Sequence, residues 1–414
     1  MGIPRVKVSL FVLPLVTWVC AFAQTSQSTD AQAAQSSTSS SVSPTTQTSP
    51  GAQTAQAAAP ASTPDPPPPT TFSNSAVRLD GIDFLGMVDG YYSFNNNHPV
   101  PSINQLYNFD DLTNQWDLNL LKLTVSHDPA PIGFRFDLGY GRAFEEMHYP
   151  NPDPDFFRYV EQAFISVKPK EWKGLEVDLG DFVTSAGAEV IESKDNWNYS
   201  RSLLFSLAIP YYHFGVRASM PIGSSLTVGV QVVNGWNTIV STHGDNMQTV
   251  GIVGAYTRKK FTWSNNYYVG PQYTTTSNRN RALFDTTLLL TPNDRINAYI
   301  NYDYGQQRRV LAPGVDWWTG IAGALHLQLN KYFAISPRFE YFNDATGFTT
   351  GTKQYLHEVT VTGEYKIMAG LLSRVEFRRD SSNVDYFNHG NEPSSSKSQT
   401  TVSLGLIAFF PSKH

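Results

Sequence analysis

The chain is poor in cysteine: its 414 residues contain one, Cys20. Cys20 lies in an N-terminal segment that begins with basic residues, continues with an apolar stretch over 8–19, and ends in a small-x-small triplet at 21–23. These features predict a secretory signal peptide over residues 1–23. Cleavage there removes the only thiol, so we expect a mature protein without disulfides. A lipid anchor on Cys20 is the alternative, but bulky residues precede it where small ones are wanted.

Long hydrophobic runs are also missing after the signal segment. The mean hydropathy is −0.29, which argues against a bundle of membrane-spanning helices. A membrane β-barrel passes the same filter, because only alternate residues of its strands touch lipid. The net charge is −5, and no dense cluster of Lys and Arg is present. Nucleic acid is therefore not an expected partner.

Large apolar side chains are almost absent from residues 24–72, which consist mainly of Ala, Gln, Ser, Thr and Pro. Such a segment cannot bury enough surface to offset the entropy of ordering it. Four consecutive prolines at 66–69 favour a stiff polyproline II spacer. We predict a disordered periplasmic leader over 24–72, followed by one domain over 73–414.

Connections between strand-like segments in this domain alternate in length. The tight ones lie at 128–132, 169–174, 221–224, 259–260, 291–294, 330–331 and 367–368. The long ones lie at 95–114, 144–158, 182–211, 236–246, 271–282, 306–314, 343–354 and 381–399. This pattern predicts an all-β fold: a transmembrane antiparallel up-and-down β-barrel of about 16 strands (range about 14–18), with short periplasmic turns and long extracellular loops.

The two faces of these segments differ in polarity. From 371 to 378, apolar or small side chains alternate with Leu372, Arg374, Glu376 and Arg378. An arginine facing the middle of the bilayer costs about 2–4 kcal/mol in a barrel, so the charged face must line the interior. Unpaired buried charges are costly, which predicts a water-filled bore. The expected pore-lining residues are Arg135, Asp137, Arg217, Arg295, Asp303, Arg338, Glu340, Glu358, Arg374, Glu376 and Arg378.

Two segments depart from simple alternation. The segment 115–127 changes phase at Leu120-Leu121, which indicates either a β-bulge or a different register. The segment 159–168 is ambiguous, because the polar pair Glu161 and Gln162 interrupts its pattern.

The longest connection, 182–211, is the third of the long loops. A loop of this length and mixed polarity is able to fold into the bore and set its size and charge, as the third loop of general porins does. The alternative is a solvated cap outside the barrel. The residues expected near a constriction are Glu189, Glu192, Lys194, Asp195 and Arg201.

Three stretches resemble a known family. They are the opening strand 88–94 with its sequence VDGYYSF, the turn HDPAPIGFR at 127–135, and the run DNWNYSRSLLF at 195–205, which continues to PYYHFGVR at 210–217. Together they resemble the putative β-barrel porin, OmpL-like family. The resemblance implies a bacterial outer-membrane barrel with poorly defined solutes, and it adds no established binding residues.

The predicted function is that of a porin in the outer membrane of a Gram-negative-type cell. Small hydrophilic solutes or ions would diffuse passively through the bore, with the 182–211 loop as constriction. The alternative is a barrel platform whose long loops bind a ligand or surface, as in an adhesin or receptor. Outer-membrane lipid is an expected partner, and a homo-oligomer such as a trimer is compatible with this size of porin.

Signals of catalysis are weak. No histidine pair has metal-ligand spacing, and neither a Gly-x-Ser-x-Gly elbow nor a Walker loop is present. We therefore expect no enzyme activity, no cofactor and no metal. A serine-type lipase barrel is a distant third interpretation, because an isolated Ser and His can meet in space.

Overall fold

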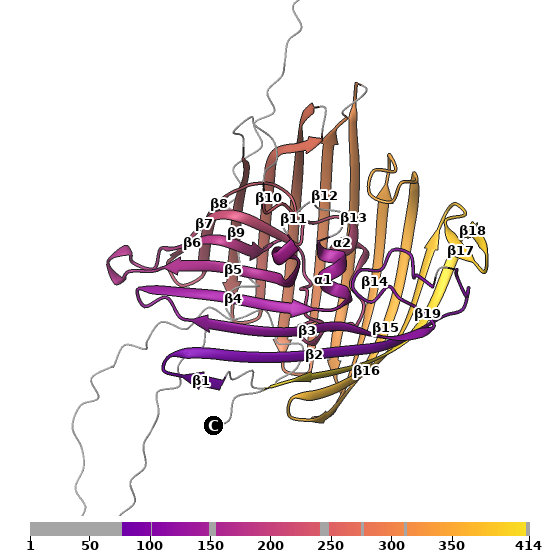
Figure 1. The fold of residues 1–414 in the computed structure, drawn as a ribbon, viewed down its shortest axis with the longest axis horizontal. Coiled ribbons are helices and arrows are strands. Elements are labelled where there is room, and N and C mark those ends of the chain that lie inside the picture. Colours follow the sequence, from indigo (N-terminus) through magenta and orange to yellow (C-terminus); the bar gives the residue numbers. More distant parts are fainter. Residues whose placement is uncertain are drawn as a thin grey trace, which may run out of the picture.

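The computed structural model describes residues 77–100, 102–148, 155–240, 248–274, 277–309 and 313–410. The predicted signal peptide (1–23) and leader (24–72) lie outside the described residues. Within the described ranges the protein is nearly all strand (Figure 1).

Sixteen long strands form a closed antiparallel barrel in the described part of the chain, as the sequence predicts. Each strand pairs with its neighbours in sequence, and the pairing of β19 with β2 closes the ring. A short additional strand, β1 (Val77–Leu79), pairs with β2. The barrel strands are β2 Ile82–Asn95, β3 Gln115–His127, β4 Ile132–Tyr140, β5 Val160–Val167, β6 Glu176–Val183, β7 Tyr212–Ile222, β8 Leu226–Val233, β9 Thr249–Arg258, β10 Phe261–Thr274, β11 Ser277–Asn293, β12 Ile296–Arg308, β13 Val315–Gln328, β14 Phe333–Asp344, β15 Gln354–Met368, β16 Leu371–Ser382 and β19 Ser398–Phe409.

Short turns and long connections alternate around the barrel, as predicted. One predicted loop, 271–282, is wrong in extent, because β10 continues to Thr274 and β11 begins at Ser277. Pro271 pairs with Asn280 and Tyr273 with Asn278, so the ladder extends through this region. Polar residues predicted to form a loop continue the strands instead, because a β-ladder is built from backbone N–H and C=O groups, which polar residues supply as well as apolar ones.

The long connections carry the remaining elements. The helices are α1 Arg142–Met147 and α2 Leu203–Leu207, and two 3-10 turns are η1 Asp155–Tyr159 and η3 Ser193–Asp195. A third 3-10 turn, η2 Lys170–Trp172, lies instead in the short connection between β5 and β6. The strands β17 Phe387–His389 and β18 Glu392–Ser396 form a separate hairpin. No helix among the described residues is long and apolar enough to cross a membrane.

The burial pattern reverses that of a soluble protein. Along β15, Glu358, Thr360 and Thr362 are buried, whereas Val359 and Val361 are exposed. The polar set faces the interior of the barrel and the apolar set covers its outer surface, which is the arrangement of a barrel in lipid.

Both irregular segments contain β-bulges that place an extra polar residue inside the barrel. Between β2 and β3, Asp89 pairs with Leu120 and Gly90 with Leu118, so Asn119 is the extra residue. The predicted phase change is therefore a bulge, one residue before the predicted position. Between β4 and β5, the register shift leaves Glu161 extra and explains the ambiguous pattern there.

Candidate functional site

The connection 184–211 between β6 and β7 folds into the barrel and carries η3 and α2. Its side chains Trp197, Tyr199 and Leu204 are buried among residues of the barrel interior. In Figure 1, α2 lies within the outline of the barrel, among the strands. Ser202 is the N-cap of α2, and its hydroxyl accepts a hydrogen bond from the Phe205 N–H at 3.0 Å. An external solvated cap does not fit this burial.

Arginines on β14 and β16 hold one side of this loop. The guanidinium of Arg374 donates to the carbonyl oxygens of Asn196 at 2.6 Å and Asn198 at 3.2 Å, and also to that of Ser193. The carboxylate of Glu364 provides its counter-charge at 2.8 Å. The side chain of Arg374 is fully buried, so these partners replace the water that a charged group otherwise requires.

Arg338 and Arg378 repeat this arrangement. Arg338 contacts Glu189 of the loop and the Ser200 carbonyl, each at 2.7 Å. Arg378 pairs with Asp380 at 2.9 Å and donates to the Arg201 carbonyl at 2.7 Å. We call Arg338, Arg374 and Arg378 the arginine side.

Carboxylates of the same wall bind backbone N–H groups of the loop. Glu340 accepts hydrogen bonds from Leu203 and Leu204, the first two residues of α2, at 3.1 and 3.2 Å. These N–H groups have no partner within a helix, so a carboxylate at this end satisfies them. Glu376 accepts from Tyr199 at 2.6 Å and from Ser200 at 3.0 Å.

A different set of contacts holds the beginning of the loop against β10–β12. Asn266 donates to the Ser185 carbonyl at 3.1 Å and to Asp285 at 2.6 Å. Asn301 accepts from the Ala188 N–H at 3.1 Å and donates to Asp285 at 2.8 Å. Asp303 lies directly opposite Asp285 on the adjacent strand. We call Asp285 and Asp303 the carboxyl side.

The tip of the loop reaches a third cluster, on β3–β5. Lys122 pairs with Asp137 at 3.1 Å, with Glu161 at 2.9 Å, and with Glu192 of the loop. Burial by itself raises the pKa of the Glu192 carboxyl, but Lys122 and Lys194 outweigh burial and lower the pKa to about 2. Glu192 is therefore held as a carboxylate.

A second connection, 96–114, covers the loop from the other side. The ring of Phe109 lies 5.7 Å from that of Phe205, and the Arg201 guanidinium lies 5.6 Å from the Phe109 ring. The next residue, Asp110, is fully buried, and its oxygens accept no hydrogen bond from the described residues. Burial raises the pKa of Asp110 to about 8, although Arg201 opposes the shift.

Most residues predicted from the sequence lie inside the barrel in this constellation. The buried ones on the wall are Asp137, Arg217, Asp303, Arg338, Glu340, Glu358, Arg374, Glu376 and Arg378. Arg135 is partly buried and pairs with Asp137 at 2.9 Å. Arg217 pairs with Asp178 at 2.7 Å and lies over the ring of Phe182.

Arg295 was expected on the wall, and this expectation is wrong. It lies in the turn between β11 and β12 and is exposed. The side chain of Asn293 accepts hydrogen bonds from the N–H groups of Arg295 and Ile296 at 2.9 and 3.0 Å. This local turn ends the strand before Arg295, and β12 begins after it.

The expectation of an interior whose charges are solvated by water also needs correction. Arg338, Arg374 and Arg378 are fully buried, and carboxylates and loop carbonyls satisfy them. Sequence reasoning omitted the backbone of the loop as a source of ligands for charge. It also missed Asp89, Lys122 and Asp285, although each lies at an inward position that strand alternation could have identified.

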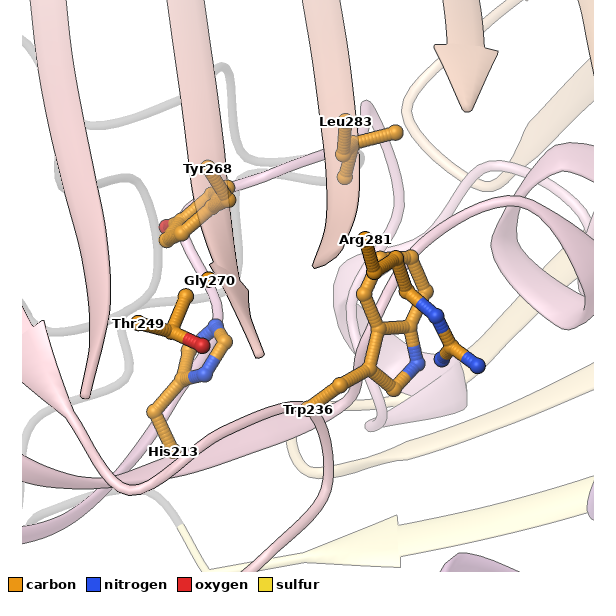
Figure 2. Close-up of a pocket in the computed structure, with 7 residues that line it drawn as sticks. All are labelled: His213, Trp236, Thr249, Tyr268, Gly270, Arg281 and Leu283. Carbon is orange, nitrogen blue, oxygen red and sulfur yellow. The ribbon is translucent and has the colours of Figure 1, made fainter. Parts of the chain in front are cut away.

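A small void lies near the long-loop end of the barrel, lined by residues of β7, β9–β11 and the connection after β8. Figure 2 shows His213, Thr249 and Tyr268 on one side of it and Arg281 beside Trp236 on the other. His213 Nδ1 donates to the Gly235 carbonyl at 2.9 Å, and its Nε2 has no hydrogen-bond partner in the described part of the chain. The described residues include no group of three or more His, Cys, Asp or Glu that could hold a metal ion.

This inverted barrel with a folded-in loop defines an outer-membrane porin fold. Residues 81–410 match the model of the family described as "Putative beta-barrel porin-2, OmpL-like". The chain belongs to this porin family, and it is located in the bacterial outer membrane. Among curated proteins, none matches the chain in sequence.

Solved structures with the same fold include OmpT, an outer membrane protein of Vibrio cholerae (TM-score 0.55, 12% identity, 81% of this chain and 99% of that chain). The outer membrane channel DcaP of Acinetobacter baumannii is similar at TM-score 0.55, 11% identity and coverage of 81% and 99%. An anion-selective porin from Comamonas acidovorans is similar at TM-score 0.53, 10% identity and coverage of 80% and 99%. These low identities support the fold alone.

Proposed function

We propose that this porin lets small hydrophilic solutes or ions diffuse passively across the outer membrane, and that loop 184–211 narrows its bore. The observation that carries the proposal is the attachment of the loop to opposite parts of the wall: Lys122 on β3, Asn301 on β12 and Arg374 on β16. A loop fixed at several points gives a defined cross-section, whereas a freely moving loop gives a variable one. The protein has no catalytic step in this proposal.

The charged side chains of the loop and the wall fall into two groups: partly exposed ones, which would meet the solute, and fully buried ones, which hold the loop. Glu192, Lys194 and Asp195 keep side-chain exposures of 16%, 14% and 24%. Arg338 and Arg374 have none. We assign the first group, with Arg135 across from it, to the wall of the conducting path. The arginine side positions the loop.

Conductance and solute uptake test the channel directly. The refolded protein is expected to give discrete single-channel currents in planar bilayers and to swell liposomes with the smallest sugars only. The size cut-off should be low because the loop fills much of the bore. A platform that uses the barrel only to display its loops would give neither swelling nor currents, and that result would overturn the proposal.

Ion selectivity tests the assignment of the path. Glu192→Gln and Asp195→Asn each remove one negative charge from the partly exposed group and should shift the reversal potential toward anions. Glu171→Gln, in the short turn between β5 and β6, is a control that should not change it. Unchanged selectivity in both loop variants would remove these residues from the path.

A homotrimer is the proposed assembly. The V. cholerae OmpT structure was also obtained in a trimer form. The mass of the detergent-solubilised protein by light scattering, corrected for bound detergent, tests this: a single-chain mass would exclude the trimer.

Purified protein should release no fatty acid from phospholipid, and hydrolysis would revive a lipase interpretation.

A further inference from the structure

Two carboxyl side chains lie opposite each other inside the wall of the barrel. Asp285 on β11 and Asp303 on β12 are register partners, and both side chains are fully buried. The Cβ atoms of directly opposite residues lie about 4.5–5.5 Å apart. Like charges at this distance in a buried site disfavour double ionisation, which favours a proton on one of the two carboxyls.

The surroundings identify which group is ionised. Asp285 accepts hydrogen bonds from the amides of Asn266 and Asn301 at 2.6 and 2.8 Å. Neither oxygen of Asp303 accepts a hydrogen bond from the described residues. Donors stabilise the charged form, so Asp285 is the carboxylate and Asp303 carries the proton.

No positive charge compensates this pair. Among the described residues, no Lys or Arg lies within ion-pair distance of either carboxyl. The charged group that acts on the pair is Glu340 of β14, and it adds negative charge. The side chains of β10 and β12 that donate to Asp285 are neutral: Asn266 and Asn301.

The same amides attach the loop. Asn266 binds Asp285 and the Ser185 carbonyl, and Asn301 binds Asp285 and the Ala188 N–H. Gly187, between these two attached residues, has φ +92°, and a Cβ there would lie 2.6 Å from Ile209 of the same loop, so this position requires glycine. A change in the charge of the pair therefore acts on residues 185–188 directly.

We propose that one proton shared by Asp285 and Asp303 fastens the beginning of loop 184–211 to the wall, and that its loss at alkaline pH releases this end and widens the pore. The first half concerns a proton-binding site; the second half rests on the proposed channel function. Deprotonation leaves a negative charge on both Asp285 and Asp303, with Glu340 nearby. The repulsion between these two charges is far stronger in a buried site than in water. Moving the loop away admits water, which relieves that repulsion.

Infrared spectroscopy tests the proton without any transport assay. The purified barrel in detergent at about pH 7 should show carboxylic-acid C=O absorption that shifts in D₂O. Asp303→Asn should lose one component of it, and the component from Asp110, whose pKa is about 8, should remain. Asparagine keeps the size of the side chain and can still donate to Asp285. Asp294→Asn, in the exposed β11–β12 turn, should retain all of this absorption. If Asp303→Asn loses no component of it, the shared proton is excluded.

Conductance tests the coupling. Between about pH 7 and about pH 10, single-channel conductance should rise in the native protein and in Asp294→Asn, and the rise should be lost in Asp303→Asn. An infrared band that depends on Asp303, together with flat conductance in all three proteins, would overturn the link between proton and loop. A protein that never conducts would defeat the channel proposal, and the infrared result would still decide the shared proton.

Discussion

The arginine side and the carboxyl side hold the same loop by different physics. On the arginine side each guanidinium has a carboxylate partner, for example Arg374 with Glu364 and Arg378 with Asp380. On the carboxyl side, Asp285 and Asp303 have no base within ion-pair distance among the described residues. Guanidinium groups stay charged at every usable pH. One attachment is therefore permanent, and the other depends on a proton.

This difference suggests a division of roles within loop 184–211. The later part, from Glu189 to Leu204, is fixed by guanidinium groups, which stay charged, together with the backbone bonds to Glu340 and Glu376. The earlier part, 185–188, depends on neutral amides around the carboxyl pair. A movement of the loop is expected to begin at the earlier part.

Removal of the loop interior breaks both attachments and should have the largest effect. Replacing residues 186–206 with a short Gly-Ser linker should raise single-channel conductance several-fold if the loop narrows the bore as proposed, because side chains of this segment lie inside the barrel. The guanidinium groups then meet water instead of loop carbonyls. Heat-modifiable gel mobility confirms that the barrel still closes, and an unchanged conductance in a closed barrel would show that the loop does not limit the path.

Removal of one buried arginine breaks the permanent attachment alone. Arg378→Met leaves Asp380 without its counter-charge and removes the shorter of the two hydrogen bonds to the Arg201 carbonyl. The free energy of unfolding should fall by about 3–5 kcal/mol, the usual cost of leaving a buried ion unpaired. Urea titration in detergent measures it.

The neighbouring residue is a matched control for that change. Arg379 faces outward and is exposed. Arg379→Met should change the unfolding free energy by no more than about 0.5 kcal/mol. Equal losses in the two variants would show that the internal pairing of Arg378 is not the cause.

Truncation of an amide breaks the proton-dependent attachment. Asn301→Ala leaves the Ala188 N–H without its acceptor and removes one donor from Asp285. We expect a loss of about 1–3 kcal/mol, smaller than for Arg378→Met because no ion pair is broken. Gln306→Ala, on the exposed face of the same strand, should stay within about 0.5 kcal/mol of the native value.

Asp110 is an intermediate case between the arginine side and the carboxyl side. It is a buried carboxyl near Arg201, but the two groups do not form an ion pair. Its pKa rises from the ordinary 3.8 to about 8 through burial. Between pH 3.8 and about pH 8, the folded state binds more protons than the unfolded state. The free energy of unfolding therefore falls as pH rises, by at most about 1.4 kcal/mol per pH unit.

The variant Asp110→Asn should remove this part of the pH dependence. Relative to the native protein it should gain stability progressively from about pH 4 to about pH 8. Urea unfolding at several pH values checks the slope. Parallel pH profiles for the two proteins would show that Asp110 is ionised in the fold.

Much of the fold could be predicted, because alternation along each strand is a local property. The inward set Arg374, Glu376 and Arg378 was recognised from the cost of placing charge in lipid, and the structure buries all three. Errors arose at strand ends. Arg295 continues the alternating pattern of β12 but belongs to a turn set by Asn293.

The contacts of the candidate site were less accessible to sequence reasoning. Glu189 and Arg338 are 149 positions apart and meet only because the loop turns inward. The pairing of Asp285 with Asp303 depends on the register of β11 and β12, and a shift by two residues would separate them.

The sequence alone determined the class of protein: polar and apolar residues alternate with a period of two, the connections alternate in length, and the charges that cannot face lipid must point inward. Only the tertiary structure decided what those charges meet. Whether a buried guanidinium finds water, a carboxylate or a loop carbonyl depends on distances between residues far apart in the chain, and those distances are set by strand register and by the path of one loop.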